Sequence, residues 1–153
     1  MTKQSIDKVI DNFIERIGQA FESDGLPRIA GRIMGFFVMH AEPVSFAELA
    51  VRLKVSRGSI STNARLLESL GVLARMTMPG DRQVYYKLAD SPFVHLIEGF
   101  VKRQKMLEAY VKSVQAEIPA SMKATRSQLR DMHAFHKAAA EHLQRLMEQI
   151  DSK

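Results

Sequence analysis

Residues 45–88 constrain the fold more than any other part of the sequence, because they predict two short helices, a tight turn and a hairpin in direct succession. Ser45 fits the N-cap of the first helix, and Glu48 completes the spacing of a capping box. Ser56 fits the N-cap of the second helix, which ends at Gly71. Helices this short are not stable alone, so they must pack crosswise on other elements. The segment therefore predicts a helix-turn-helix.

The predicted hairpin follows directly, with strands over residues 72–77 and 83–88. Between them, residues 78–81 have Pro and Gly where a tight turn favours them. A helix-turn-helix followed by a two-stranded wing is the arrangement that places a helix in the DNA major groove. Arg82 would then lie at the wing tip, where it could reach the minor groove or a phosphate. The alternative is an exposed arginine at an ordinary turn.

The second helix of the motif has one apolar face and one small polar face. Ile60, Ala64 and Leu67 fall on the face predicted to be buried. The opposite face is predicted to carry little bulk and one basic side chain, and consists of Gly58, Thr62, Arg65 and Ser69, with Ser61 flanking it. Such a face can approach a groove closely and donate hydrogen bonds to base edges or phosphates. An ordinary solvated face is the alternative interpretation.

Amphipathic helices are predicted on both sides of this segment. Apolar spacing predicts a helix over residues 2–22, and a helix over residues 27–41 is apolar on most sides, which is typical of a central core helix. Further along, apolar residues alternate three and four positions apart through residues 93–118 and, after Pro119, through residues 122–150. This seam could fold back within one chain or pair with another chain. Because the helix-turn-helix has its own core, we expect homodimerisation.

The charge of the chain favours a polyanionic partner. The formal net charge is +5 and the pI is about 9.6. Residues 1–24 hold three basic and five acidic side chains, whereas residues 45–90 hold seven basic and four acidic ones. The predicted DNA-reading segment is therefore basic, although only mildly so.

Several function classes are disfavoured by the sequence. The chain has no cysteine, which removes disulfides, thiolate zinc sites and thiol redox sensing and fits a reducing compartment. No signal peptide and no membrane-spanning run is predicted, so we expect a cytoplasmic protein. Gly58-Ser59-Ile60-Ser61 lacks the second glycine of a nucleophile elbow, and no phosphate-binding glycine loop is present. We therefore expect neither an enzyme nor a cofactor.

Two further groups of residues have a specific and an ordinary interpretation. His133 and His136 are three residues apart on one predicted helix, which could contribute to a metal site, but a packed or pH-sensitive interface histidine is the favoured interpretation. Phe36, Phe37, Met39 and His40 could line the pocket of a small effector, and core packing is the favoured interpretation for each of them. We predict no metal site.

The order of these elements resembles the MarR superfamily of bacterial transcriptional regulators, and residues 25–33 with residues 55–61 are similar to its GbsR-like branch. The resemblance is best over residues 25–90. It implies a dimeric DNA-binding regulator, most often a repressor, with the recognition helix over residues 56–70, Arg82 as the wing arginine and Arg75 as a phosphate contact. The sequence departs from the family in having a shorter wing turn. Thr62 also replaces a long basic residue, so base readout would rely on Arg57, Ser61 and Arg65.

We therefore expect a mainly α fold with a small two-stranded wing, divided into an N-terminal dimerisation helix (residues 1–24), a winged helix-turn-helix domain (25–90) and a C-terminal helical dimerisation region (91–153). The expected function is regulation of transcription as a homodimer on palindromic double-stranded DNA, with a small effector as a further partner. A winged helix used for protein contact is the alternative. The residues predicted to contact DNA are Ser45, Ser56, Arg57, Ser59, Ser61, Thr62, Arg65, Arg75 and Arg82.

Overall fold

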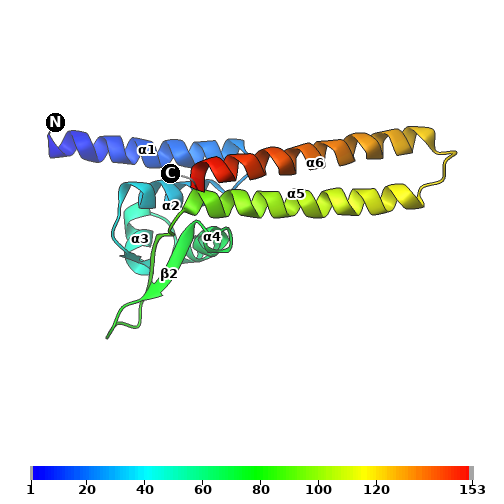
Figure 1. The fold of residues 1–153 in the computed structure, drawn as a ribbon. Helices are drawn as coiled ribbons and strands as arrows, with labels where there is room; N and C mark the ends of the chain where they lie inside the picture. The colour runs from blue at the N-terminus through cyan, green and yellow to red at the C-terminus, as the bar shows by residue number, and fades with distance from the viewer. Residues whose placement is uncertain (1, 152–153) are drawn as a thin grey trace. The chain divides into compact units, whose positions relative to one another are not determined.

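The computed structural model describes residues 2–151 and divides into two compact units, with the division after Pro92. The first unit contains α1 (Lys3–Ser23), α2 (Arg28–Met39), β1 (Val44–Ser45), α3 (Phe46–Leu53), α4 (Arg57–Ser69), β2 (Leu73–Thr77) and β3 (Val84–Leu88) (Figure 1). The second unit is built from α5 (Pro92–Glu117) and α6 (Lys123–Asp151). The predicted mainly helical fold with a small wing is confirmed.

In the first unit, α1 and α2 approach each other closely because glycines lie at their contact. A Cβ atom on Gly31 would lie 2.7 Å from the carbonyl oxygen of Ile17, and one on Gly35 would lie 3.2 Å from the Cα of Ile14. A Cβ on Gly18 of α1 would meet the Arg32 side chain at 2.6 Å. Any larger residue at Gly31 would force the two backbones apart. The first helix is therefore an integral part of this unit.

The core of the first unit surrounds α2, as the apolar character of that helix predicts. Ile33 and Phe37 are almost completely buried, and the rings of Phe36 and Phe37 meet edge to face at 5.3 Å. Leu49 of α3 and Ile60 and Leu67 of α4 are also fully buried. Each short helix of the motif thus directs its apolar residues into one shared core, which supplies the stability that the helices lack alone.

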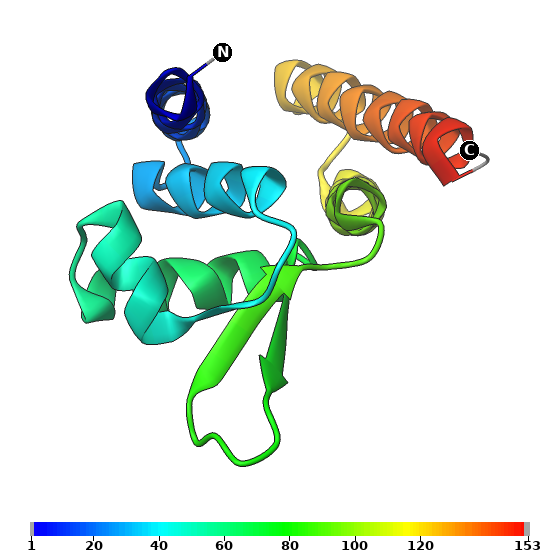
Figure 2. The same ribbon diagram turned by 90° about the vertical axis from the view of Figure 1, so that its left-hand side faces the viewer.

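The wing is part of a three-stranded antiparallel sheet in the order β1-β3-β2. The hairpin of β2 and β3 was predicted, and Figure 2 shows it extending away from the helices of the first unit. The short strand β1 was not predicted; it pairs Ser45 with Tyr85 and Val44 with Tyr86. The expected two-stranded wing therefore gains a third strand, which places β3 in the centre of the sheet.

The second unit is an antiparallel helical hairpin in which part of the predicted seam folds back within the chain. Gln104 of α5 and His136 of α6, both seam positions, are joined by a 2.6 Å hydrogen bond between Oε1 and Nδ1. His133 Nε2 lies 3.5 Å from a carboxylate oxygen of Glu108. These contacts favour the packed interpretation of both histidines. Across the described residues, no three His, Asp or Glu side chains gather in a way that could hold a metal ion.

The hairpin nevertheless leaves many large apolar side chains exposed. Phe135 of α6 and Tyr110 of α5 are each 66% exposed, and Met106 is 61% exposed. We call this group the apolar surface of the hairpin; it consists of Phe93, Phe100, Met106, Leu107, Tyr110, Met122, Met132, Phe135, Leu146 and Ile150. Within residues 2–151, no helix has the length and apolar character needed to cross a bilayer.

Candidate nucleic-acid interface

The start of each helix in the helix-turn-helix is fixed by a serine. The Ser45 hydroxyl accepts a hydrogen bond from the Glu48 amide at 3.2 Å, and the Ser56 hydroxyl accepts one from the Ser59 amide at 3.2 Å. Both predicted N-caps are confirmed. The carboxylate of Glu48 pairs with Arg52 at 2.7 Å, so the predicted capping box is formed only by its serine half. The two caps define the register of α3 and α4.

The turn between the two helices is closed by backbone hydrogen bonds. Lys54 adopts a left-handed conformation with φ of 55°, and the Val55 amide donates to the Ala50 carbonyl at 3.1 Å. This pattern satisfies carbonyls at the end of α3 that would otherwise lack partners. Arg32 of α2 donates a further hydrogen bond to the Leu53 carbonyl at 2.9 Å. The turn that aims α4 is therefore held to the core helix as well as to α3.

The predicted division of α4 into a buried and an outer face is confirmed for most positions. Ile60, Ala64 and Leu67 are buried, whereas the outer residues Gly58, Thr62, Arg65 and Ser69 are exposed. Two hydroxyl groups on the outer face already donate within the helix, from Thr62 to the Gly58 carbonyl at 3.1 Å and from Ser69 to the Leu66 carbonyl at 2.7 Å. These two side chains can therefore act toward a ligand mainly as acceptors.

Sequence reasoning missed Asn63, which is buried to 7% exposure on the inner side of α4. Its Nδ2 atom donates to the Ser59 carbonyl at 2.8 Å, and its Oδ1 atom has no partner among the described residues. Its spacing from Ile60 and Leu67 places it on the buried face of the helix, but its polar type argues for exposure, and the spacing was the signal that could have found it. Ser59, whose carbonyl receives this bond, is half-buried, and its amide is held by Ser56.

A groove between α4 and the wing gathers four of the predicted DNA-contacting residues. Its volume is about 320 Å³, and α3, α4, β2 and β3 all contribute to it. We call it the basic groove, because the lining includes three arginines and no acidic residue; it consists of Phe46, Ala47, Arg57, Ser61, Arg65, Arg75, Gln83, Val84 and Tyr86. The fold thus brings Arg75, which is distant in sequence, beside the outer face of α4.

The arginines of the basic groove are not neutralised by the protein. In the part of the chain that the structure describes, none of Arg57, Arg65 and Arg75 forms an ion pair, whereas Arg28, Arg32 and Arg52 do. The pKa of Tyr86 is raised by its burial and, to a smaller extent, by Glu68. Arg75 and Arg65 act in the opposite direction and lower it, so both guanidinium groups lie within electrostatic reach of the Tyr86 hydroxyl.

The wing tip carries Arg82 on an ordered turn. Gly80 has a φ of 79°, which glycine adopts without strain, and the Asp81 amide donates to the Met78 carbonyl at 3.1 Å. The Asp81 carboxylate accepts one hydrogen bond from the Gln83 amide at 2.9 Å and one from the Tyr85 hydroxyl at 2.7 Å. Arg82 is exposed and forms no ion pair among the described residues. It lies outside the lining of the basic groove.

Ser45 differs from the other predicted site residues. It is only 7% exposed, it pairs with Tyr85 in the sheet, and its hydroxyl is engaged as the N-cap of α3. As a cap this hydroxyl only accepts, so it could still donate a hydrogen bond, but its burial leaves little access for DNA. The structure gives it a local role in fixing the start of α3.

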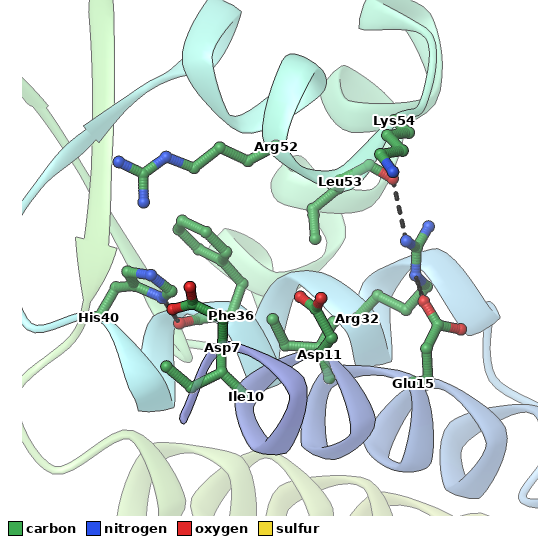
Figure 3. A pocket seen from close by; sticks show the side chains of 11 residues that line it. Asp7, Ile10, Asp11, Glu15, Arg32, Phe36, His40, Arg52, Leu53 and Lys54 are labelled. Carbon is green, nitrogen blue, oxygen red and sulfur yellow. Dashed lines mark hydrogen bonds and ion pairs between the residues drawn. The ribbon is translucent and has the colours of Figure 1, made fainter. Parts of the chain in front are cut away.

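A second cavity, of about 460 Å³, lies between α1, α2 and α3 (Figure 3). Phe36 and His40, which were considered as effector-binding residues, both line it, and their rings stack with centroids 4.1 Å apart. Phe37 is instead buried in the core, and Met39 does not line the cavity. Figure 3 shows Arg32 at the end of the cavity between Glu15 and the Leu53 carbonyl, with 2.6 Å separating Arg32 Nε from Glu15 Oε1.

Comparisons with known proteins match most of the winged segment, up to the start of β3. The family model described as the MarR family matches residues 24–83. The chain is 34% identical over 131 residues to the HTH-type transcriptional regulator MmpR5 of Mycobacterium tuberculosis (strain ATCC 25618 / H37Rv), which covers 82% of this chain and 79% of that protein.

A second relative and a solved structure agree with this match. The chain is 26% identical over 83 residues to the putative HTH-type transcriptional regulator YvaV of Bacillus subtilis (strain 168), covering 54% of this chain and 47% of that protein. A crystal structure described as a transcriptional regulator superposes with a TM-score of 0.76 and 28% identity, covering 94% of this chain and 99% of that one.

Proposed function

The chain belongs to the MarR family of DNA-binding transcriptional regulators, and from this premise we propose that it is a homodimeric repressor of a palindromic operator. The observation that carries this proposal is the basic groove, in which three arginines that form no ion pair within residues 2–151 converge from α4 and β2. The phosphate backbone of DNA is a suitable partner for such a surface. Each phosphate that an arginine neutralises releases condensed cations into solution, which favours binding. Arg57 and Arg65 of α4 would lie toward the major groove, and Arg75 toward a phosphate.

The proposed dimer rests on the apolar surface of the hairpin. The folded-back seam buries Ile97, Val101 and Val111 of α5, but it leaves Phe135 and Tyr110 mostly in water. Apolar side chains this large and this exposed would gain free energy if a partner covered them. A second copy of the same chain is the proposed occupant. Two copies would present two α4 helices to successive major grooves about one helical turn of DNA apart, which predicts an inverted-repeat operator.

We also propose that the cavity between α1, α2 and α3 accepts a small effector. The Phe36–His40 stack offers an aromatic surface, and Arg52 lies 5.7 Å from the Phe36 ring centroid. Because the cavity includes Leu53 and Lys54, an occupant would touch the residues that lead into the turn before α4. Occupancy could therefore change the position of α4 and with it the affinity for DNA.

Within the family, we propose that the chain falls in the GbsR-like branch. Support comes from the residues of 25–33 and 55–61, which resemble that branch. The first of these segments leads into α2 and the second into α4, so both lie at the start of helices that build the reading unit.

Selection of binding sites from a random pool of DNA duplexes, at near-physiological salt, tests the proposed function. The expected result is enrichment of an inverted repeat that binds two chains, as measured by sizing of the complex. Binding of a single chain to an asymmetric site would contradict the palindromic operator. Absence of enrichment, with only weak and salt-sensitive binding, would favour a winged helix used for protein contact. Adding the selected operator to a reporter gene would then distinguish repression from activation.

A further inference from the structure

An acidic residue at the tip of the wing is unexpected on a surface proposed to face DNA, because its charge would repel phosphate. Asp81 immediately precedes Arg82, yet its two carboxylate oxygens are both engaged by the wing itself. Oδ1 accepts a hydrogen bond from the Gln83 amide at 2.9 Å, and Oδ2 accepts one from the Tyr85 hydroxyl at 2.7 Å. The position of the carboxylate is therefore set by two hydrogen bonds within the hairpin, and these two donors partly compensate its negative charge.

The hydrogen bond to the Gln83 amide encloses Arg82. A carboxylate that accepts from the amide two residues on forms a closed turn around the intervening residue and restricts its backbone. The tip on the other side is also ordered, because the Asp81 amide donates to the Met78 carbonyl at 3.1 Å. Arg82 therefore leaves the wing from a fixed backbone position, although its own side chain is exposed and forms no ion pair in residues 2–151.

Tyr85 connects this turn to the most constrained strand of the sheet. Because β3 is the central strand, Tyr85 pairs with Ser45 of β1 on one side and Met76 of β2 on the other. Its hydroxyl reaches back four residues to Asp81. The electrostatics agree with a real donor–acceptor pair: the hydrogen bond to Gln83 and then that to Tyr85 lower the pKa of Asp81, and the bond to Asp81 raises the pKa of Tyr85.

We propose that Asp81 and Tyr85 are a positioning pair that holds the wing turn in the conformation from which Arg82 contacts DNA. This inference rests on the proposed DNA-binding function and deepens it. A free wing would have to lose conformational entropy on binding, whereas a turn already closed by Asp81 and anchored by Tyr85 loses less. Tyr85 acts through Arg82 and does not itself need to touch the nucleic acid.

The test removes only the Tyr85 hydroxyl, with Tyr85→Phe. We expect operator affinity to fall by about three- to ten-fold, and the log–log salt dependence to lose about one unit for each arginine contact that is lost. Ser121→Ala, which removes an exposed hydroxyl from the turn between α5 and α6, is the control and should leave both quantities unchanged. Thermal unfolding of both variants checks that the fold is retained.

A double-variant cycle separates positioning from a merely structural role. If Tyr85 acts through Arg82, the affinity of Tyr85→Phe/Arg82→Ala should equal that of Arg82→Ala alone, because the second change has nothing left to affect. Additive losses, or an unchanged salt dependence in Tyr85→Phe, would overturn the proposal.

A measurement without DNA distinguishes failure of this inference from failure of the proposed function. Trypsin cleaves after arginine, and cleavage at an exposed turn reports how often its backbone opens. We expect faster cleavage after Arg82 in Tyr85→Phe and Asp81→Ala than in the natural chain, and no change in Ser121→Ala. If the variants are cleaved faster but no duplex is selected, the Asp81–Tyr85 hydrogen bond does hold the turn (we call this bond the tether), and its role in DNA binding is refuted. An equal cleavage rate would refute the tether itself.

Discussion

The two units of the molecule are incomplete in opposite ways. The first unit buries Ile33, Phe36 and Phe37 of α2, but among the described residues it leaves the arginines of the basic groove without ion-pair partners. The second unit pairs polar side chains across its hairpin, as Gln104 does with His136 and Lys105 with Gln144, but exposes Phe135 and Tyr110. One unit lacks counter-charge, and the other lacks apolar cover.

This difference shows what kind of partner each unit requires. Exposed cations cost little in water but gain strongly from a polyanion, so the first unit does not need a permanent partner for them and is expected to gain from a transient one. Exposed aromatic surface is unfavourable in water, so the second unit gains most from a permanent apolar partner. The comparison predicts that changes on the hairpin will affect assembly and that changes on the groove will affect DNA binding without affecting assembly.

The largest effect is expected from a charge on the apolar surface of the hairpin. Phe135→Glu removes an exposed aromatic side chain and would bury a charge in the proposed dimer interface. The cost should be at least about 3 kcal/mol, or roughly a hundred-fold in the dimer dissociation constant. Sedimentation equilibrium measures it. Ala134→Glu adds the same charge at an exposed position of α6 and is the control. Equal dimerisation of both variants would show that Phe135 is not covered.

A smaller effect is expected from the glycine contact that makes the first unit compact. Gly31→Ala would place a Cβ atom 2.7 Å from a backbone oxygen of α1, so the helices must separate. We expect a loss of about 1–3 kcal/mol in the free energy of unfolding. Gly58→Ala, whose added Cβ would meet nothing within 4 Å, is the matched control for stability. Chemical denaturation of both variants gives the comparison, and equal midpoints would contradict the close contact.

The groove should respond at about the same scale but in DNA affinity alone. Arg65→Ala removes one exposed guanidinium from the outer face of α4 and should weaken operator binding by about 1–2 kcal/mol while altering sequence preference. Arg16→Ala removes the same charge from an exposed position of α1 and should have little effect. Equal losses in the two variants, measured by fluorescence anisotropy, would mean that net charge rather than the groove determines binding.

The smallest predicted effect is a shift in the ionisation of Tyr85. Its pKa is raised above 10.0, first by the hydrogen bond to Asp81, with Glu48 contributing least. The stability from this bond is therefore fully present below the unfolded-state pKa and is lost as the pH rises through the folded-state pKa. Asp81→Asn should move the tyrosinate absorbance transition at alkaline pH to lower values, and Glu48→Gln should move it less. Equal shifts would contradict the assigned cause.

The same pair has an acidic counterpart. The pKa of Asp81 is lowered from 3.8, first by the Gln83 amide and then by Tyr85. Its contribution to the wing is therefore present above the unfolded-state pKa and is lost as the pH falls through the folded-state pKa. The tether is consequently complete between these two limits, which include neutral pH.

Local signals account for what the sequence could predict. Ser45 and Ser56 mark the starts of two helices, because each caps its helix through a short-range hydrogen bond. The Pro79-Gly80 turn defines the hairpin. The helix-turn-helix and the wing could therefore be predicted from residues close together in the sequence. The grouping of Arg75 with Arg57 and Arg65 followed only from resemblance to a known family, because the contact crosses from a strand to a helix.

What the sequence could not predict depends on contacts between distant residues. The strand β1 is only two residues long and is defined by pairing with β3, about forty residues later, so it carries no periodic signal. Asn63 is buried although its type favours exposure. The seam has the same three-and-four spacing whether it folds back or pairs with another chain. The Gln104–His136 bond shows that part of the seam folds back, whereas Phe100 and Leu146 remain exposed.

The glycine contact between α1 and α2 also determines which backbone amides exchange with solvent together. Helices that contact each other through long side chains can unfold locally one at a time. A helix whose backbone packs directly against another backbone loses nearly all of that packing once it moves. The middle of α1, around Ile14 and Gly18, both buried, should therefore have the same opening free energy as α2, although α1 lies at the end of the chain. Its first turns, with Ile6 and Val9 exposed, are free to exchange earlier. A terminal helix thus behaves, at its centre, as part of the slowest-exchanging core.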